Sequence, residues 1–206
     1  MTAAALSGSI AAARPSGYGS VWLKRAIDMG DRKLLNIELH RVTAKEYKEL
    51  PPSGIVVVLD NIRSAHNVGS AFRSSDAFKV DKMVLCGISA MPPSAEIHKS
   101  ALGAEDSVDW VYYSDTLSAV DALRKDGYTI VSVEQTVGSI KLDKFCPEPG
   151  RRYALVFGNE VEGVRQDVVD ASDFALEIPQ FGTKHSLNVS VSVGVILWHL
   201  RSRLLI

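Results

Sequence analysis

The sequence predicts an α/β fold with a mainly parallel sheet and helices on both faces of that sheet. The first observation is the continuous β-branched run over 55–59, closed by Asp60 and Asn61, which is typical of a strand buried on both faces. The second is the regular alternation of short apolar segments with amphipathic segments of about a dozen residues, which is typical of βαβ units. We find no internal repeat.

The later elements follow in the same alternating order. After the first strand we expect a helix over 67–78, a strand over 82–86 that ends at Gly87, a helix around 94–104, a strand over 108–112, a helix over 116–125, and strands over 128–133, 152–157 and 174–178. Gly127 marks the end of the helix over 116–125, because glycine just past the last periodic residue is a common helix stop.

The last segment, 186–206, fits two patterns. Apolar residues alternate with Ser and Asn up to Val195, as they do in a strand, whereas the residues from Gly194 onward have helical character. Ser186 together with Asn188 could cap a helix that starts there. Periodicity alone favours a strand up to Val195.

Composition excludes several classes of protein. A chain of 206 residues with 46% hydrophobic residues suits one globular domain. Cys86 and Cys146 belong to no CxxC or Cys/His cluster, so we expect no metal site and two reduced thiols in the cytoplasm. The apolar stretches over 55–59 and 191–200 are too short or too interrupted to cross a membrane.

The chain divides into three expected parts. Residues 1–20 are rich in Ala, Ser and Gly and are expected to be a flexible leader without signal-peptide character. Residues 21–53 form an N-terminal extension that could contact a nucleic acid, and 54–206 form the main domain. The net charge of −1 argues against a generally basic nucleic-acid binder, so any nucleic-acid contact must be a local patch.

Two segments have a local positive excess. The first covers 24–49, and the second is the C-terminal stretch with Lys184, Arg201 and Arg203 and no acidic residue after Glu177. Ordinary solvated faces are the alternative interpretation of both.

Three clusters of polar residues and glycines each follow a predicted strand, where parallel sheets present their ligand-binding loops. They read DNIRSAHNVGSAFRS over 60–74, LVFGNEVEG over 155–163, and IPQFGTKHSLNVS over 178–190.

Together these clusters resemble the three signature motifs of the TrmH (SpoU) class of SPOUT RNA methyltransferases. Those motifs are N-x-G-x-x-x-R-[ST], a hydrophobic run ending in G-N-E-x-x-G, and I-P-(x)-S-L-N-V-S. The three occur in the right order and spacing, whereas N-x-G or G-N-E alone would mean little. The resemblance implies a parallel α/β sheet with a C-terminal trefoil knot, an exception to the usual absence of knots. It also implies that 186–206 is helical.

The resemblance further implies that S-adenosylmethionine is held in the knotted loops. The residues expected to bind it, largely through backbone groups, are Thr136, Gly158, Ile178, Gln180 and Leu187. A glycine lets backbone approach a ligand closely, and Ile178 and Leu187 offer apolar faces to the adenine. Without the motif context, plain core packing would explain both apolar residues.

The catalytic residues implied by the resemblance are Arg73, Asn67, Glu160, Ser186 and Asn188. A ribose hydroxyl is a poor nucleophile near neutral pH and needs orientation and stabilisation of its developing negative charge. Arg73 supplies a fixed positive charge, and its pKa above about 12 argues against its acting as a general base. Our hypothesis is that Arg73 grips the target phosphate and lowers the hydroxyl pKa, while a phosphate oxygen or water takes the proton.

The other catalytic candidates have ordinary alternatives. Asn67, Ser186 and Asn188 could be helix caps, and Glu160 could be a surface acid. His66 and His185 flank two of the motifs, but loop histidines are usually solvated, so we give neither a catalytic role.

The family works as a homodimer, in which Arg73 of one subunit approaches the cofactor of the other. Ser190 and Gly194 allow close helix approach, with Trp198 and Leu205 as apolar anchors, although they could equally pack within one chain.

The expected product is a 2′-O-methylated RNA. Small members of the family act mainly on tRNA, so tRNA is the first expectation and rRNA the second. The alternatives are a non-catalytic RNA-binding paralogue and a base methyltransferase. A dinucleotide-binding oxidoreductase fits poorly, because the first cluster lacks G-x-G-x-x-G.

Overall fold

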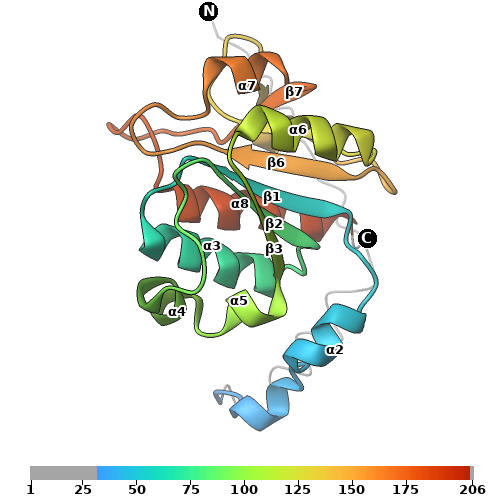
Figure 1. The fold of residues 1–206 in the computed structure, drawn as a ribbon. Coiled ribbons are helices and arrows are strands. Elements are labelled where there is room, and N and C mark those ends of the chain that lie inside the picture. The colour runs from blue at the N-terminus through green and yellow to red at the C-terminus, as the bar shows by residue number, and fades with distance from the viewer. Residues whose placement is uncertain (1–31, 205–206) are drawn as a thin grey trace, which may run out of the picture. The chain divides into compact units, whose positions relative to one another are not determined.

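The computed structural model describes residues 32–204 and divides them between two compact units. The first unit, Met1–Arg41, contains the 3-10 helix η1 (Asn36–Leu39). The second unit, Val42–Ile206, contains the sheet and the other helices (Figure 1). The flexible leader predicted over 1–20 lies outside the described residues.

The second unit is built on a seven-stranded sheet in the order β3-β2-β1-β6-β4-β7-β5. The strands are β1 (Ile55–Asp60), β2 (Lys82–Cys86), β3 (Asp109–Tyr113), β4 (Thr129–Val133), β5 (Ile140–Lys141), β6 (Tyr153–Phe157) and β7 (Phe174–Glu177). Neighbouring strands pair in parallel throughout. The predicted α/β class with a parallel sheet is confirmed.

Helices cover both faces of this sheet, as predicted. They are α2 (Ala44–Glu49), α3 (Ala65–Ala77), α4 (Ala95–Ala101), α5 (Ala104–Ser107), α6 (Thr116–Lys125), α7 (Gln166–Asp170) and α8 (Val189–Leu204), with the 3-10 turn η2 at Leu142–Lys144. Figure 1 shows α6 and α7 on one face, and α3 and α8 on the other.

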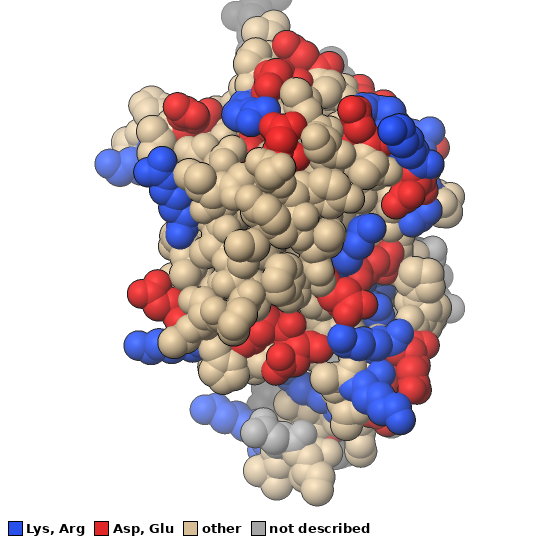
Figure 2. Space-filling model, in the orientation of Figure 1, with Lys and Arg blue, Asp and Glu red and all other residues tan. Residues whose placement is uncertain are grey.

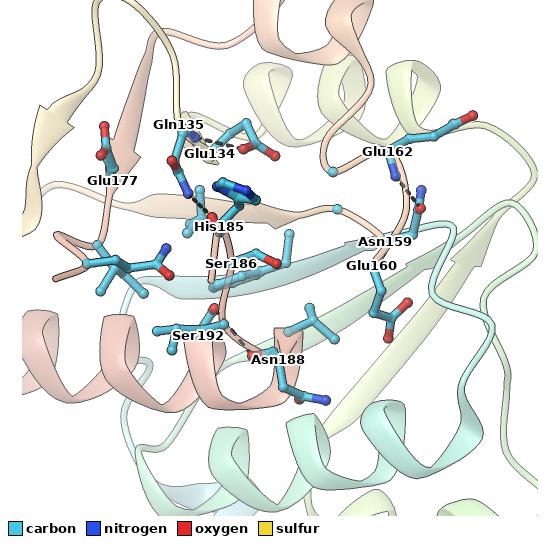
Figure 3. Close-up of a pocket in the computed structure, with 18 of the residues that line it drawn as sticks. Glu134, Gln135, Asn159, Glu160, Glu162, Glu177, His185, Ser186, Asn188 and Ser192 are labelled. Carbon is cyan, nitrogen blue, oxygen red and sulfur yellow. Dashed lines mark hydrogen bonds between the residues drawn. The ribbon is translucent and has the colours of Figure 1, made fainter. Parts of the chain in front are cut away.

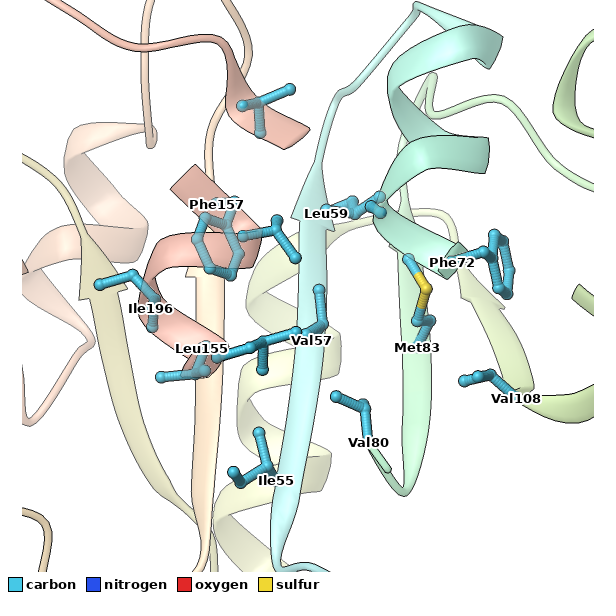
Figure 4. Packing of buried hydrophobic residues seen from close by; sticks show 14 of the residues in the cluster. Ile55, Val57, Leu59, Phe72, Val80, Met83, Val108, Leu155, Phe157 and Ile196 are labelled. Atoms are coloured by element: carbon cyan, nitrogen blue, oxygen red, sulfur yellow. The ribbon is translucent and has the colours of Figure 1, made fainter. Parts of the chain in front are cut away.

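Strand β1 explains why both faces must be covered. All six of its residues are buried, and the five apolar ones alternate between two hydrophobic clusters. Ile55, Val57 and Leu59 belong to the cluster beneath α3 and α8 (Figure 4), whereas Val56 and Val58 belong to the cluster beneath α6 and α7. This alternation is the period of two that a strand imposes on its side chains.

The glycine of the first motif has a packing role. A Cβ on Gly69 would lie 2.0 Å from Ser100 Oγ and 2.5 Å from the carbonyl oxygen of Ile97, both on α4. The absence of a side chain therefore lets α3 and α4 approach closely. Helix α3 begins at Ala65, where the Ser64 hydroxyl caps it by accepting from the Asn67 amide at 3.3 Å.

We expected the main domain to start at Gly54, but the second unit starts earlier, at Val42. Helix α2 packs into the core through Tyr47, whose hydroxyl donates to the carbonyl oxygens of Ser75 and Val80 at 3.3 and 3.2 Å. Burial raises the pKa of this Tyr47 hydroxyl above its ordinary value. The part of the extension from Val42 onward is thus integral to this unit.

Three further expectations concern what the chain lacks. Among the described residues, none of the helices has both the length and the apolar character that a membrane span requires. Within residues 32–204, no group of three or more His, Cys, Asp and Glu side chains is placed to hold a metal ion. Cys86 and Cys146 are both free, and burial raises the pKa of the Cys86 thiol to about 12.

Candidate active site

A cavity of about 420 Å³ opens at the carboxyl ends of β4, β6 and β7 (Figure 3). The residues that line it come from all the loops that follow these strands and from the start of α8, namely 133–135, 157–163, 176–178, Gln180, 185–189 and Ser192. Its volume lies within the range of roughly 300–1,000 Å³ that is usual for small-molecule sites. The second and third motifs of the sequence therefore meet around one cavity.

The loop of the second motif folds back on itself. The Asn159 side-chain oxygen accepts from the backbone amides of Val161 and Glu162 at 3.0 and 2.9 Å, and the Gly163 amide donates to the Asn159 carbonyl at 3.0 Å. A Cβ on Gly158 would lie 1.9 Å from the carbonyl carbon of Gly163. Gly158 thus allows backbone to approach backbone within this loop, and the close approach of its backbone to a ligand, which the sequence suggested, stays a prediction.

Glu134 braces this loop from the end of β4. Its carboxylate accepts from the backbone amides of Gln135 at 2.7 Å and Val164 at 3.0 Å. Gly163 has a φ of +70°, and its Cα lies beside the same carboxylate. A Cβ at this position would lie 2.2 Å from Glu134 Oε2. Any side chain at 163 would displace the brace.

The loop after β4 also closes over the third motif. Gln135 Nε2 donates to the carbonyl oxygen of His185 at 2.6 Å, and this contact is visible in Figure 3. Both residues line the cavity. Thr136, which we expected to bind the cofactor, is not among the lining residues. Its carbonyl oxygen instead accepts from the backbone amide and the hydroxyl of Ser139 at 3.2 and 3.0 Å.

Three polar side chains, one from each motif, are joined in a chain of hydrogen bonds. Asn188 Nδ2 donates to Asn67 Oδ1 at 3.1 Å, and Asn67 Nδ2 donates to Glu160 Oε1. Figure 3 shows Glu160 and Asn188 on the same side of the cavity. Asn67 is 7% exposed, and the α3 cap is Ser64, so Asn67 is not itself a cap. Residues far apart in sequence are thereby fixed at one wall of the cavity.

Asn188 serves at the same time as the cap of α8. Its side-chain oxygen accepts from the Ser190 amide at 2.9 Å and from the Ser190 hydroxyl at 2.6 Å, while its carbonyl oxygen accepts from the Ser192 amide at 3.0 Å. These are the bonds of an N-cap residue. The helix predicted over 186–206 therefore starts at Val189, and residues 205–206 lie outside the described part of the chain.

Two substitutions of Asn188 should separate its two roles, which are to cap α8 and to donate to Asn67. We expect Asn188→Ala to lower the free energy of unfolding by about 2 kcal/mol, because the helix loses its cap and Asn67 Oδ1 loses its donor. Asn188→Ser keeps a capping oxygen but cannot reach Asn67, so its loss should be about half as large. Urea unfolding of the three proteins measures both values, and equal losses would show that the cap contributes nothing.

Acidic side chains dominate the charge of the cavity. Glu134, Glu160, Glu162 and Glu177 line it, and no Lys or Arg does. Glu177 is bonded to Lys141 and accepts from the Ser139 hydroxyl at 2.6 Å, and both contacts hold the pKa of its carboxyl below the ordinary value. Such a cavity suits a ligand with positive charge as well as apolar surface, since Phe157, Leu176 and Ile178 supply apolar atoms.

Within one chain, Arg73 lies outside the cavity. Its side chain is exposed on α3 and is not a lining residue. Among the described residues it has no ion-pair or side-chain hydrogen-bond partner. The next residue, Ser74, lies beside α8, where its Oγ is 3.8 Å from the position of a Cβ on Gly194. Gly194 therefore faces α3 of its own chain.

Most of the candidate residues meet at the cavity. Gly158, Glu160, Ile178, Gln180, Ser186, Leu187 and Asn188 line it, and Asn67 joins it through Glu160 and Asn188. Glu134, Gln135 and Glu177 also line the cavity, although none of them is named as a site residue from the sequence. Their signal was available, because acids and amides at the carboxyl ends of parallel strands share one edge of a sheet.

The comparisons with known proteins agree with this geometry. Residues 54–198 match the model of the SpoU rRNA Methylase family. The chain is 33% identical, over 72% of its length and 56% of the relative's, to the 23S rRNA (guanosine-2'-O-)-methyltransferase RlmB of Nitrosomonas europaea. It is 27% identical, over 76% of its length and 62% of the relative's, to a putative TrmH family tRNA/rRNA methyltransferase of Staphylococcus aureus. It therefore spans less than two thirds of these relatives.

A solved structure supports the same assignment. The TrmH/SpoU tRNA modifying enzyme of A. aeolicus superposes with a TM-score of 0.67 at 25% identity, and the match covers 78% of this chain and 81% of that one. The family model covers more than half of the sequence, including all three motifs and the loops around the cavity. The chain belongs to the SpoU methylase family, also called the TrmH family.

Proposed function

We propose that this protein transfers a methyl group from S-adenosylmethionine to a ribose 2′-hydroxyl of a structured RNA. The observation that carries the proposal is the cavity at which residues of all three family motifs meet through the Asn188–Asn67–Glu160 hydrogen bonds. The N. europaea relative, at 33% identity, is a guanosine-2'-O-methyltransferase, which supports the same reaction here.

The cavity fits S-adenosylmethionine in size and in chemistry. The molecule combines an apolar adenine face with a sulfonium and an ammonium group, and it supplies an activated methyl group when bound. Ile178 and Leu187 offer apolar atoms, and the acidic lining that includes Glu177 favours the positive groups. Gly158 and Gln180 contribute the remaining expected contacts, whereas Thr136 would have to act from outside the present lining.

Arg73 is the residue that we expect to act on the RNA. Its guanidinium would grip the target phosphate and stabilise the charge that develops on the hydroxyl oxygen, while a phosphate oxygen or water accepts the proton. Asn67, Glu160, Ser186 and Asn188 would position the ribose or the loops around it. Since Arg73 is exposed and outside its own chain's cavity, it is free to reach the cavity of a second subunit.

A homodimer would bring Arg73 of one subunit close to the cavity of the other. Helix α8 exposes Val191, Val195 and Trp198, which share one helical face, and Trp198 also lies 6.2 Å from Phe78 between ring centroids. Burying this apolar face against a second copy would place the neighbouring α3, with Arg73, at the interface. The sequence suggested Ser190 and Gly194 as the contact, but Gly194 faces Ser74 within the chain.

We expect tRNA as the substrate ahead of rRNA. The chain matches 81% of the A. aeolicus tRNA modifying enzyme, but only 56% of the N. europaea rRNA enzyme. To test the reaction, purified protein is incubated with labelled S-adenosylmethionine and separate tRNA and rRNA pools. The RNA is then digested to nucleosides and the product is identified by mass spectrometry. A 2′-O-methylnucleoside supports the proposal, and a methylated base would replace it with base methylation.

Binding without transfer would point to the non-catalytic paralogue. Cofactor affinity is therefore measured by calorimetry on the same preparation. Cofactor binding with no product from either pool would favour an RNA-binding role.

Charge reversal in the N-terminal segment tests where the RNA is held. Lys24 and Arg25 of that segment lie outside the described residues. Arg32 is paired with Glu38, and Lys48 with Asp109 at 2.9 Å, so we select the exposed Lys33, Arg41 and Lys45 instead. Figure 2 shows acidic and basic side chains intermixed on one face, without one continuous basic field, so a few cations should decide RNA affinity.

The triple variant Lys33→Glu, Arg41→Glu, Lys45→Glu should weaken tRNA binding. The slope of log K against log salt should fall by about 0.7–0.9 for each lost phosphate contact. Affinity for S-adenosylmethionine should not change. Filter binding at several salt concentrations measures the slope, and Lys125→Glu, a charge reversal on α6 outside this segment, serves as a control for the loss of positive charge as such. An unchanged slope in the triple variant would contradict RNA contact by this segment.

A further inference from the structure

A second cavity lies away from the active site, at α4, α5 and the start of β3. It has a volume of about 630 Å³ and is open to solvent on one side. Its lining includes Pro92, Pro93, His98, Glu105, Asp106 and Trp110. None of these residues lines the first cavity, and none belongs to the three motifs.

The feature that demands an explanation is the carboxylate of Glu105. Its side chain is only 9% exposed, and its Oε1 contacts His98 Nδ1 at 2.6 Å. Its other oxygen, Oε2, is buried and has no hydrogen-bond partner among the described residues. A buried acceptor without a donor costs free energy, and the cost is larger when the acceptor is charged. Oε2 has almost no accessible surface in this arrangement, so a ligand that draws the Glu105 side chain toward the cavity and donates to Oε2 would recover this free energy.

The surroundings of Glu105 select the ligand's charge. Asp106 adds a second carboxylate to the lining, whereas on the adjoining segments Asp109 is paired with Lys48 and the exposed Glu96 is accompanied by the exposed Lys99. The lining contains no Lys or Arg. Trp110 lines the same cavity and is 37% exposed, so an indole is available to a cation. A phosphate-bearing ligand such as RNA would be repelled here.

We propose that this second cavity binds a guanidinium group, with Glu105 Oε2 accepting from its N–H donors and Trp110 contacting its planar face. A guanidinium has several donors in a fixed plane and is weakly hydrated, so it suits a site with one buried acceptor beside an aromatic ring. Asp106 strengthens the attraction. The group can come from an arginine of a partner polypeptide or from a free guanidine compound, and the chemistry of recognition is the same.

The test uses the full-length protein and does not depend on methyl transfer. Acetyl-Gly-Arg-Gly-amide is titrated into ¹⁵N-labelled protein, and the indole N–H signal of Trp110 is followed by NMR after assignment with Trp110→Phe. We expect a saturating shift of this signal. The same peptide with citrulline, which has the shape of arginine without its charge, should bind at least about tenfold more weakly.

Matched variants separate the site from general acidity. Glu105→Gln should weaken binding of the arginine peptide at least about tenfold, whereas Glu96→Gln, which removes a charge from α4 outside the lining, should change it less than about twofold. Thermal unfolding verifies that both variants fold. Should Glu105→Gln unfold, Asp106→Asn replaces it, with a loss of about threefold or more expected.

A second ligand, agmatine, identifies the source of the guanidinium group, and several other results would contradict the proposal. Agmatine binding as tightly as the peptide would indicate a small-molecule ligand, and tighter peptide binding would indicate a polypeptide partner; both support a guanidinium site. No shift of the Trp110 signal, equal binding of the citrulline peptide, or equal losses in Glu105→Gln and Glu96→Gln would overturn it. A shift produced only by a short single-stranded RNA would also overturn it.

Discussion

Arg73→Ala is expected to reduce methyl transfer by about 10²–10³-fold, the effect of removing a group that stabilises developing negative charge in a transition state. The fold should not change, because the Arg73 side chain is exposed and has no ion-pair or side-chain hydrogen-bond partner among the described residues. Single-turnover rates with saturating RNA and labelled cofactor measure the loss. Thermal unfolding and cofactor affinity should match those of the unmodified protein.

The control for Arg73→Ala is Arg151→Ala. Arg151 is also exposed, but it precedes β6 at the amino end of the sheet, opposite the cavity, and is paired with Glu148 at 3.0 Å. Arg151→Ala should retain the rate of methyl transfer of the unmodified protein. Arg73→Lys then distinguishes charge from shape, since lysine keeps the charge without the planar fork. A near-full rate with an unchanged pH profile in Arg73→Lys would refute the role that we give to the fork.

Mixing subunits would test whether Arg73 acts across a dimer. A preparation that combines Arg73→Ala chains with chains defective in cofactor binding should recover activity, because one composite site then has an intact arginine and an intact cavity. Recovery is expected only if the two residues come from different subunits. Failure to recover, in a preparation shown to contain mixed dimers, would place Arg73 at its own chain's site.

The sequence predicted the elements whose pattern is determined locally. The strands β1 and β6 are continuous apolar runs and are buried throughout, and α6 has an amphipathic period with a glycine stop. The helices α2 and α7 were missed because each spans less than two turns, too short for a period to emerge. Tyr47 shows why such a segment still folds, since its stability comes from distant backbone partners that no local pattern reveals.

Helix α8 shows the limit of periodicity most clearly. The alternation up to Val195 indicates a strand, yet the segment from Val189 is helical. Much of the helix is apolar, with Val193, Ile196 and Leu197 fully buried and Val191 and Val195 exposed, so its apolar residues do not follow one narrow stripe. The cap at Asn188 and the packing against α3 decide the conformation, and only the motif anticipated it.

The candidate site was predicted as a set of residues but not as a set of contacts. The motifs supplied Asn67, Glu160 and Asn188, and the structure supplied the bonds that join them. Roles that depend on neighbours could not be inferred from one sequence. Glu134 is an example, because its function as a brace depends on the amide of Val164 from another loop.

Gly158→Ala is expected to damage both the fold and the cavity. A Cβ at 158 would lie 1.9 Å from the carbonyl carbon of Gly163 and 2.0 Å from the amide nitrogen of Val164. Both contacts are backbone atoms, so no side-chain rotation can relieve them. We expect the free energy of unfolding to fall by about 3 kcal/mol, the upper end of the usual cost of overpacking, and the melting temperature to fall by roughly 6–12 °C.

Gly138→Ala is the matched control for this substitution. Gly138 lies in the loop after β4, and a Cβ there would meet no atom within 4 Å. The same change should therefore be neutral or raise stability by up to about 1 kcal/mol through the unfolded chain. Equal losses in the two variants would contradict a packing role for Gly158.

The cofactor affinity of Gly158→Ala then connects the packing to the function. Opening the 158–163 loop moves Glu160 away from Asn67 and releases the Val164 amide from Glu134, so the wall of the cavity loses its shape. Calorimetry below the melting temperature should show at least about a tenfold loss of affinity for S-adenosylmethionine. An unaltered affinity in a destabilised protein would mean that the glycine serves the fold alone, and that the loop's internal closure and its ligand contacts are separate properties.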